Sequence, residues 1–599
     1  MNTSTSGPGS DPDFEAVAAL RRDRVQVPAR EVERVLERLR KLRLAEYANA
    51  LTTSATGRPP VLSGPALLAG MFLTAARHHG RVPMTQVADL LHYALPLATR
   101  RELRIRDYPD TANGFEGAYA ATLRAFHRLA DACDPSPLPK NKRLERDEAA
   151  RIAAEADLKA LDAARQRLTV LSNLIVEDSL TPARVLLERH WDGSVAVDGT
   201  AVGAYSKGMR SSGSVTATDP DAAWHVRTGD HADPETGGTR QQSFSADGGR
   251  GKPVYKYAYE ATFAVARDPR RDGTPVPCGG PDLSLVPALV LGFILDKPGH
   301  RPGANAATIL ANLHGRGYPP GFAAGDRLFN NSDPALFQLP IRALGYKPVF
   351  DYRDDQLGIH TQHAGAIQIE GAWYCPEIPA PLIEATTDLK AQRIDRETWT
   401  NRIAARTPYL LMAKQAPDPE GHQRFSCPAA AGKVHCPRKP GLVSPEHPRR
   451  HLMPIVFPQP SPVAPPKVCA QASITIPPQA GAKHDQDLQY GTAPWAAVYF
   501  RLRNSVEGIN GFSKDPAHEN IEAGATRRIR GIAATSILLA FQIHHANTRK
   551  LATWADTLAG PDGQPPRRRP TRRRATKPLG TWTPAGHLTQ PSDPADGPQ

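Results

Sequence analysis

The sequence lacks long hydrophobic runs and contains little cysteine. No window of 18 or more apolar residues occurs in the 599 residues, and the first 30 residues lack the basic, apolar and small-residue order of a signal peptide. These absences exclude a membrane-spanning helix and lead us to expect a cytoplasmic protein. The six cysteines are too few and too scattered for a disulfide framework, so we expect reduced thiols.

Apolar and aromatic residues are also scarce, whereas proline and glycine are frequent. Hydrophobic residues make up 40% of the chain and aromatic residues 6%, beside 58 prolines and 47 glycines. This composition indicates folded domains separated by long irregular segments. Since a single core rarely grows beyond about 250 to 300 residues, the chain should contain several domains.

Positive charge exceeds negative charge, giving a formal net charge of +13. The excess favours a polyanionic partner such as nucleic acid, although an acidic membrane surface would also satisfy it. Between Arg567 and Lys577, six arginines and one lysine form a basic run. We expect this run to bind polyanions weakly and without sequence preference.

Composition and hydrophobic periodicity divide the chain into five segments. Its beginning is rich in Ser, Gly, Pro and Asp, and its end in Pro, Gly and Arg, compositions typical of disorder. Helical spacing is followed by strand-like runs, then by a segment without helical period, then again by helical spacing. The predicted parts are a disordered arm at 1–28, a helical region at 29–180, an α/β core at 181–349 and 485–556, an insertion subdomain at 350–484 and a disordered basic tail at 557–599.

The helical region offers a candidate DNA-binding element. Ser63 is a good N-cap for one helix and Thr85 for the next, and a further helix is predicted over 144–175. Two helices joined by a short Gly/Pro turn resemble a helix-turn-helix, although such pairs occur in most helical domains. The side chains placed to meet phosphates are Thr99, Arg100, Arg101 and Arg104.

The predicted core contains four short runs that are β-branched or aromatic and bounded by Gly, Pro or Asp. They span 194–202, 255–266, 287–296 and 322–326, and helices are predicted between the last two and after the last. This order indicates a mixed α/β layer. The insertion gathers proline and four of the cysteines, so we expect it to be β-rich or irregular.

Two aspartates stand where strand-like runs give way to turns. Asp198 precedes Gly-Thr in SVAVDGTAV, and Asp326 ends FAAGD. In an open α/β sheet, ligand-binding side chains collect at strand ends. The pair is therefore a candidate site for a hard metal ion, although Asp at a strand end is also ordinary turn chemistry.

A helix near the C-terminus carries a third carboxylate between two cations. In VYFRLRNSVEGINGFSK, the residues Phe500, Arg503, Glu507 and Lys514 stand at offsets that place them within a sector of roughly 60° on a helix. A carboxylate flanked by cations suits a site that holds both metal ions and phosphates. The alternative is a solvated salt-bridge face.

On these residues the chain resembles the DDE-type transposases of bacterial insertion sequences that carry a Tyr-Arg-Glu-Lys signature. The family pattern is an aromatic residue, then Arg, Glu and Lys at the spacings of Phe500, Arg503, Glu507 and Lys514, with Phe here in place of the usual Tyr. Tyr499 is one position out of register. The stretches TDPDAAWHVR, YKYAYEATFAV and AAGDRLFNN are similar to other segments of the family.

The resemblance implies a ribonuclease-H-like catalytic core interrupted by an insertion, and a DNA transposase that cuts transposon ends and joins them to target DNA. It implies Asp198, Asp326 and Glu507 as catalytic ligands of Mg²⁺, for which Mn²⁺ can substitute. Arg503, Lys514 and Phe500 would contact DNA. Such a protein of a bacterial mobile element would act in the cytoplasm at the nucleoid, as a homodimer when it pairs two DNA ends and without a membrane.

Further candidate residues are Lys207 and Arg327, which are near the ligands in sequence and could contact phosphate. The insertion cysteines lack a CxxC pair, so buried thiols are favoured over structural zinc. Two other functions stay open. One is a metal-dependent DNA nuclease without strand transfer, and the other is a non-catalytic DNA-binding protein derived from a transposase.

Overall fold

The computed structural model describes residues 26–53, 60–209, 213–227, 254–268, 286–439, 450–458 and 464–558. Outside these ranges it gives four two-residue strands, β3 (His231–Ala232), β4 (Thr239–Arg240), β15 (Thr581–Trp582) and β16 (Leu588–Thr589). Nearly all of the predicted arm at 1–28 and tail at 557–599 lies outside the described residues, as does Cys278.

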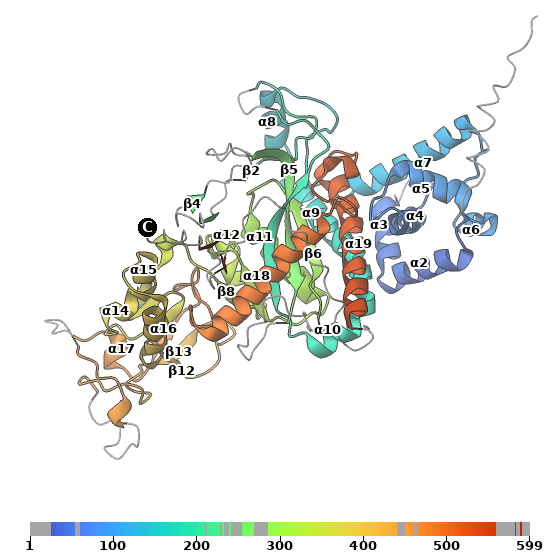
Figure 1. Cartoon of the computed structure of the whole chain (residues 1–599). Helices are drawn as coiled ribbons and strands as arrows, with labels where there is room; N and C mark the ends of the chain where they lie inside the picture. The colour runs from blue at the N-terminus through green and yellow to red at the C-terminus, as the bar shows by residue number, and fades with distance from the viewer. Residues whose placement is uncertain are drawn as a thin grey trace, which may run out of the picture.

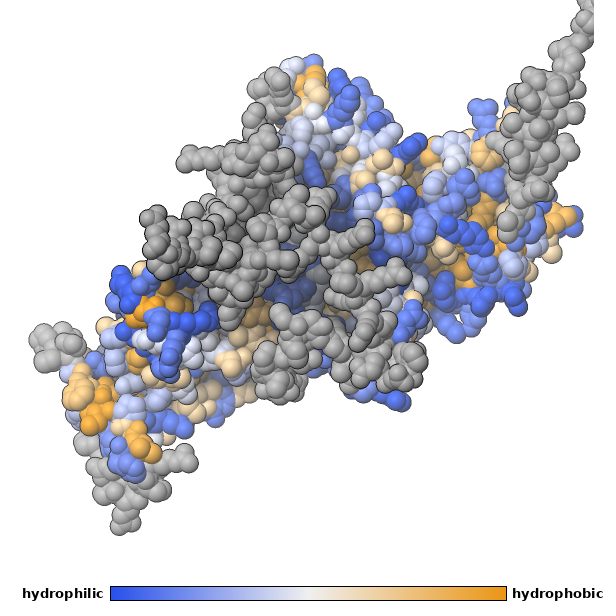
Figure 2. Space-filling model, in the orientation of Figure 1, coloured by the Kyte–Doolittle hydropathy of each residue, from blue (hydrophilic) through white to orange (hydrophobic). Residues whose placement is uncertain are grey.

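The described parts follow one another along an elongated molecule, with the N-terminal helices at one end, a sheet in the middle and the insertion at the other end (Figure 1). Hydrophilic residues predominate on the described surface of the middle part, and hydrophobic patches lie toward both ends (Figure 2). Among the described residues, no helix has the length and apolar character needed to cross a membrane.

The N-terminal region is helical, but two predicted details are wrong. Ser63 does cap its helix by accepting from the Ala66 N–H. The next helix begins at Met84 after Pro83, not after Thr85, and continues as a π-helical turn. The helix predicted over 144–175 is two helices, because Asp157 caps a new one. The helices are α2 (Ala29–Lys41), α3 (Leu44–Thr52), α4 (Gly64–Arg77), α5 (Met84–Asp89), η1 (Leu90–Ala94), α6 (Leu97–Glu102), α7 (Ala112–Asp131), α8 (Arg146–Ala154), α9 (Leu158–Leu180), η2 (Thr181–Ala183) and α10 (Arg184–His190).

A mixed six-stranded sheet forms the centre. Its strands are β1 (Val195–Gly203), β2 (Ala223–Arg227), β5 (Val254–Ala266), β6 (Leu289–Asp296), β7 (Phe322–Gly325) and β8 (Lys347–Phe350). β5 is antiparallel to β1 on one edge and to β2 and β6 on the other. β1, β7 and β8 are parallel neighbours in that order. The prediction of a mixed α/β fold is confirmed.

Helices cover both faces of this sheet, which is why β6 is buried at every position. One face shares a hydrophobic core with the N-terminal helices, α18 (Ala493–Ser513) and α19 (Ile532–Leu558). The other face packs against α10, α11 (Pro302–Gly315) and α13 (Gln338–Ala343). Short helical turns complete this part at α12 (Arg327–Asn330) and η6 (Gly524–Thr526).

The insertion between β8 and α18, which was predicted to be β-rich or irregular, contains short helices as well as strands. Its two three-stranded sheets are joined by short helices around a separate hydrophobic core. The elements are η3 (Asp354–Gln356), β9 (Ile359–His363), β10 (Ala366–Ile369), β11 (Ala372–Tyr374), α14 (Ala380–Ile383), α15 (Ala385–Lys390), α16 (Arg396–Ala405), η4 (Thr407–Tyr409), β12 (Met412–Ala413), β13 (Gln423–Ser426), η5 (Arg450–Leu452), α17 (Lys467–Ala470) and β14 (Ile474–Ile476).

Candidate active site

Asp198 and Asp326 directly follow the residues that pair the two neighbouring parallel strands β1 and β7. The register of β1 and β7 runs from Val195 opposite Ala323 to Val197 opposite Gly325, so each aspartate is the next residue of its chain. Asp326 ends β7 and caps α12, where its carboxylate accepts the Leu328 N–H at 2.9 Å. Asp198 is inside β1, not at its end as predicted, because β1 continues to pair with β5 as far as Gly203.

The Asp198 carboxylate is nearly buried, and two side chains of α18 contact it. Its side chain is 14% exposed, and Arg503 Nη1 lies 3.3 Å from Oδ1. Asn510 donates from Nδ2 to Oδ2 at 3.0 Å. Burial and, to a smaller extent, the neighbouring Asp326 raise the pKa of Asp198 to about 6 against the opposing charge of Arg503. The two aspartates therefore form an electrostatically coupled acidic pair.

Helix α18 brings Glu507 to this pair through Arg503. Pro494 stands in its first turn, and the buried residues of the helix pack on the sheet. Arg503 binds Asp198 on one side and Glu507 on the other, with Nη2 2.7 Å from Glu507 Oε1. The Glu507 side chain is 59% exposed. The structure thus gathers Asp198, Asp326, Arg503 and Glu507, with Arg503 between the carboxylates.

The aromatic residue that faces the acidic pair is Tyr499, not Phe500. Phe500 is 51% exposed. Tyr499 is buried and stacks on Trp495 at a centroid distance of 5.0 Å. Burial raises the pKa of Tyr499, and the charges of Asp351 and Asp326 raise it further. The reason is helical spacing, since Tyr499 and Arg503 are four residues apart and share a face.

The other predicted DNA contacts have different surroundings. Arg327 makes two hydrogen bonds to Asp351 Oδ2, at 3.0 and 2.9 Å, so it is already paired beside the site. Lys207 is exposed in the loop that follows β1. Lys514 follows α18 as its C-cap residue, about 10 Å along the axis from Glu507. Of the predicted helix-turn-helix side chains, Thr99 is buried, and Arg100 binds the His92 carbonyl and Asp107.

A fourth carboxylate near the site was not predicted. Glu260 of β5 accepts the Gly299 N–H at 2.8 Å, and burial, together with the charge of Asp326, raises its pKa. A Cβ at Gly199 would stand 2.3 Å from Glu260 Oε1, so a side chain beside Asp198 would displace the Glu260 carboxylate. The sequence signal was available, because Glu260 is the only acidic residue of β5.

The DPDA segment that resembles the transposase family contacts β5 and the start of α19, and not the acidic pair Asp198 and Asp326. The Tyr259 hydroxyl donates to the Asp219 carboxylate, whose two oxygens lie 2.7 and 2.8 Å from it, and burial raises the pKa of Asp219 to about 6. Asp221 lies 3.1 Å from Lys140 Nζ and accepts the Ile532 N–H that opens α19. These contacts fix the sheet to α19.

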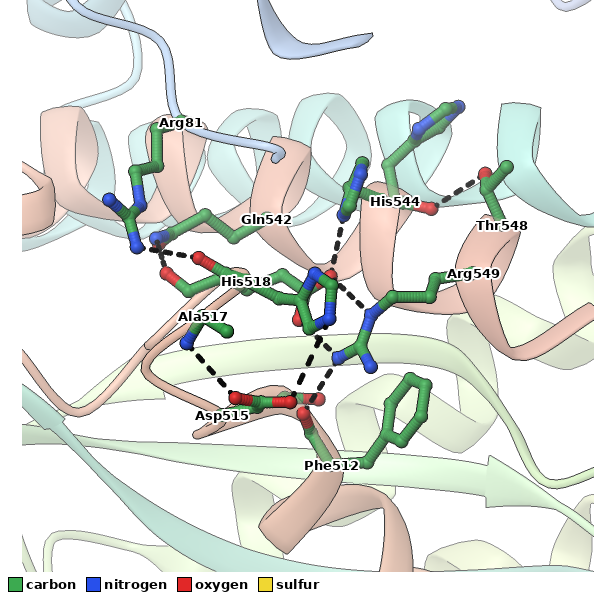
Figure 3. Close-up of polar contacts among 12 residues, drawn as sticks. Arg81, Phe512, Asp515, Ala517, His518, Gln542, His544, Thr548 and Arg549 are labelled. Carbon is green, nitrogen blue, oxygen red and sulfur yellow. Dashed lines mark hydrogen bonds and ion pairs between the residues drawn. The ribbon is translucent and has the colours of Figure 1, made fainter. Parts of the chain in front are cut away.

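A polar cluster holds the C-terminal end of α18 (Figure 3). Arg549 of α19 donates to the Phe512 carbonyl at 2.9 Å and to Glu519, which is fully buried. Arg81, which follows α4, donates to the His518 carbonyl at 2.6 Å. The loop after the candidate site is therefore attached both to α19 and to the N-terminal helices.

The oxygen donors of this site suit Mg²⁺, which prefers carboxylates and retains water. In the part of the chain that the structure describes, no three His, Cys, Asp or Glu side chains are already arranged to hold a metal ion. Arg503 is the reason at this site, since it separates Asp198 from Glu507. Asn510 Oδ1 is a further oxygen, buried and without a hydrogen-bond partner among the described residues. These oxygen donors fit Mg²⁺ if the Arg503 side chain turns away from Asp198 and Glu507 toward another anion.

The chain was compared with models of protein families and with curated proteins. No family model matches it, and no curated protein does.

Proposed function

We propose that this protein is a DNA transposase that cuts transposon ends and joins them to target DNA with two divalent metal ions. The observation that carries the proposal is the coupled pair Asp198 and Asp326, with Arg503 and Glu507 presented to it by one helix. The strand arrangement supports a ribonuclease-H-like core, in which the first strand is flanked by an antiparallel hairpin on one side and parallel strands on the other. β1 has these neighbours.

In this proposal Asp198, Asp326 and Glu507 hold two Mg²⁺ ions, which would activate the attacking oxygen and stabilise the leaving oxygen of one in-line displacement. Arg503 would then contact the DNA phosphate next to the cut, because its partners Asp198 and Glu507 would bind the metal ions instead. Tyr499 lies one helical turn before Arg503, Phe500 offers an exposed ring, and Lys514 and Arg327 would contact other phosphates of the DNA. In cleavage the attacking group at this site would be water. In joining it would be the 3′-hydroxyl of the cut strand.

The test is a cleavage and joining assay on DNA that carries the inverted repeats flanking the gene. Wild-type protein should need Mg²⁺ or Mn²⁺, and Asp198→Asn should lower cleavage by more than about a hundredfold. Glu37→Gln, at an exposed carboxylate of α2, is the matched control and should cleave normally. Undiminished cleavage by Asp198→Asn would reject the site.

Products of the same assay separate the proposed transposase from the simpler nuclease. Joined molecules show strand transfer, whereas cut ends that never join show hydrolysis alone. If the protein binds the ends but neither cuts nor joins them in either metal, the non-catalytic DNA-binding function is the correct one.

A further inference from the structure

The insertion contains a cluster of thiols separate from the carboxylates. Of the five cysteines that the structure describes, all free, four belong to the insertion. Cys375, Cys427 and Cys469 are buried in its hydrophobic core, and Cys436 packs against the same core. A small hydrophobic core supplies little stability, so a cross-link such as a bound metal ion would stabilise this subdomain considerably.

The backbone brings these cysteines together from four segments. Cys375 directly follows β11 and Cys427 directly follows β13, which belong to different sheets. Residues 410–412 connect the two sheets, since Leu410 pairs with Tyr374 and Met412 with Ser426. Cys436 follows the bridge between His435 and Ile455, and Cys469 is in α17, where the preceding N–H donates to the Ala364 carbonyl.

Three of the cysteines begin a tight Cys-Pro turn. The carbonyls of Cys375, Cys427 and Cys436 accept the N–H groups of Ile378, Ala431 and Lys439, at 3.2, 3.1 and 3.0 Å. Such turns direct following N–H groups back toward the sulfur atom, and the Glu377 N–H does bind the Cys375 thiol. N–H donors of this kind stabilise a thiolate, which is the form that binds metals.

The thiols are also near enough to influence one another. Burial, with smaller effects of Cys427, Cys469 and Cys436, raises the pKa of Cys375 to about 12. Arg438 has the opposite effect on Cys469 through a hydrogen bond, and it lies 3.3 Å from Glu377. A bound divalent ion would take these side chains as thiolates.

We propose that Cys375, Cys427, Cys436 and Cys469 bind one structural zinc ion. Zinc takes four thiolates in a tetrahedron with Zn–S distances of about 2.3 Å. The described side chains do not yet stand at such spacing, so binding draws the four sulfur atoms inward at the ends of their turns. It releases four protons and leaves a net charge of −2 beside the Arg438 guanidinium. The ion would join the two sheets of the insertion.

The test is the metal content of the full chain, which does not depend on the proposed transposase activity. After chelation of loosely bound metal and gel filtration, the wild type should retain one zinc per chain. Cys427→Ser and Cys436→Ser should each lose it. Cys133→Ser, at a buried free cysteine outside the cluster, is the matched control and should retain it.

Cobalt reconstitution keeps the proposal testable if a serine variant does not fold. The chelated wild type, given Co²⁺ alone without oxygen, should show intense thiolate-to-cobalt charge transfer and the visible bands of tetrahedral cobalt. Absence of both zinc and these bands in the wild type would overturn the proposal. So would full zinc retention by the folded Cys436→Ser variant.

Discussion

At the scale of single residues, Asp198 carries the largest electrostatic cost of the candidate site. Its carboxylate is nearly buried, and from α18 Arg503 forms an ion pair with it and Asn510 donates a hydrogen bond to it. Burial and a neighbouring carboxylate both disfavour ionisation. A site that stores unfavourable negative charge in this way is suited to bind cations, because a bound cation removes the cost.

The stability of the metal-free protein should therefore depend on the charge of Asp198. Because its pKa rises from 3.8 to about 6 on folding, the unfolded chain releases this proton first, and stability falls as pH rises from about 4 to about 6. At pH 8, the free energy of unfolding of Asp198→Asn should exceed that of the wild type by up to about 3 kcal/mol. Below pH 4 the difference should vanish.

Urea unfolding at a series of pH values without divalent metal measures this difference. A gap of equal size at pH 4 and pH 8 would contradict the role of charge burial and assign the effect to packing.

Asn510 is a positioning residue for Asp198, since its amide holds one carboxylate oxygen. Asn510→Ala should weaken Mn²⁺ binding by about 10- to 100-fold, as loss of a group that orients a ligand does. Calorimetric titration of the protein with Mn²⁺ measures the affinity. Asn504→Ala, on the exposed side of the same helix, should bind as wild type, and equal affinity of both variants would remove Asn510 from the site.

At the scale of elements, α18 connects the core to the chemistry. One side of the helix packs on the sheet through Leu502, Val506 and Ile509. The adjacent side presents Arg503 and Asn510 to Asp198, and Tyr499 is near enough to Asp326 for its charge to act on the hydroxyl. Glu507 lies at the edge of this side and is exposed. A rotation of the helix would therefore change packing and site together.

The neighbouring aromatics of α18 should behave differently on substitution. Tyr499→Ala should cost about 3 kcal/mol or more of stability, because it empties a buried position stacked on Trp495. Phe500→Ala should change stability by less than about 1 kcal/mol, because the ring is half exposed. Urea unfolding measures both.

Tyr499→Phe separates the hydroxyl from the ring, since it keeps the packing. It should fold as stably as the wild type and cleave DNA more slowly. If its cleavage rate equals that of the wild type, the hydroxyl has no part in the reaction.

At the scale of the whole molecule, the N-terminal helices and one face of the sheet share a single hydrophobic core. The polar cluster around Glu519 adds a second connection, since it joins the loop after α18 to α19 and Arg81 (Figure 3). If the N-terminal helices bind DNA, a displacement of these helices would therefore also move the sheet and the helix that carry the carboxylates.

Removal of the Glu519 charge should loosen this connection. Although burial disfavours the charged form, hydrogen bonds from His545 and Arg549 hold the pKa of Glu519 below its ordinary value of 4.5. Its contribution to stability is therefore present above that value and lost as pH falls through the lower, folded-state pKa. At pH 7, Glu519→Gln should cost about 3 to 5 kcal/mol, as the removal of one partner of a buried pair does.

Thermal unfolding at pH 7 measures this cost. Asp515→Asn is the control from the same loop, because its partially exposed carboxylate lies 3.8 Å from His518. The control should cost less than about 1 kcal/mol. Equal losses of stability in the two variants would show that burial of the Glu519 ion pair makes no additional contribution.

The sequence by itself determined the local features. Strand-like runs predicted the segments of β1 and β7, Ser63 predicted a helix start, and spacing put Arg503 and Glu507 on one helix face. These features depend on neighbours within a few residues, so periodicity and capping rules reach them.

Only the tertiary structure decided which distant residues meet. Nothing in the sequence placed Asn510 on Asp198, or showed that Tyr499 and not Phe500 lies toward the acidic pair. The convergence of the four insertion cysteines on one core likewise depends on how two small sheets pack. Such contacts join positions far apart in the sequence, 312 residues in the case of Asp198 and Asn510. They follow from strand register and helix rotation, which the global packing of the core sets.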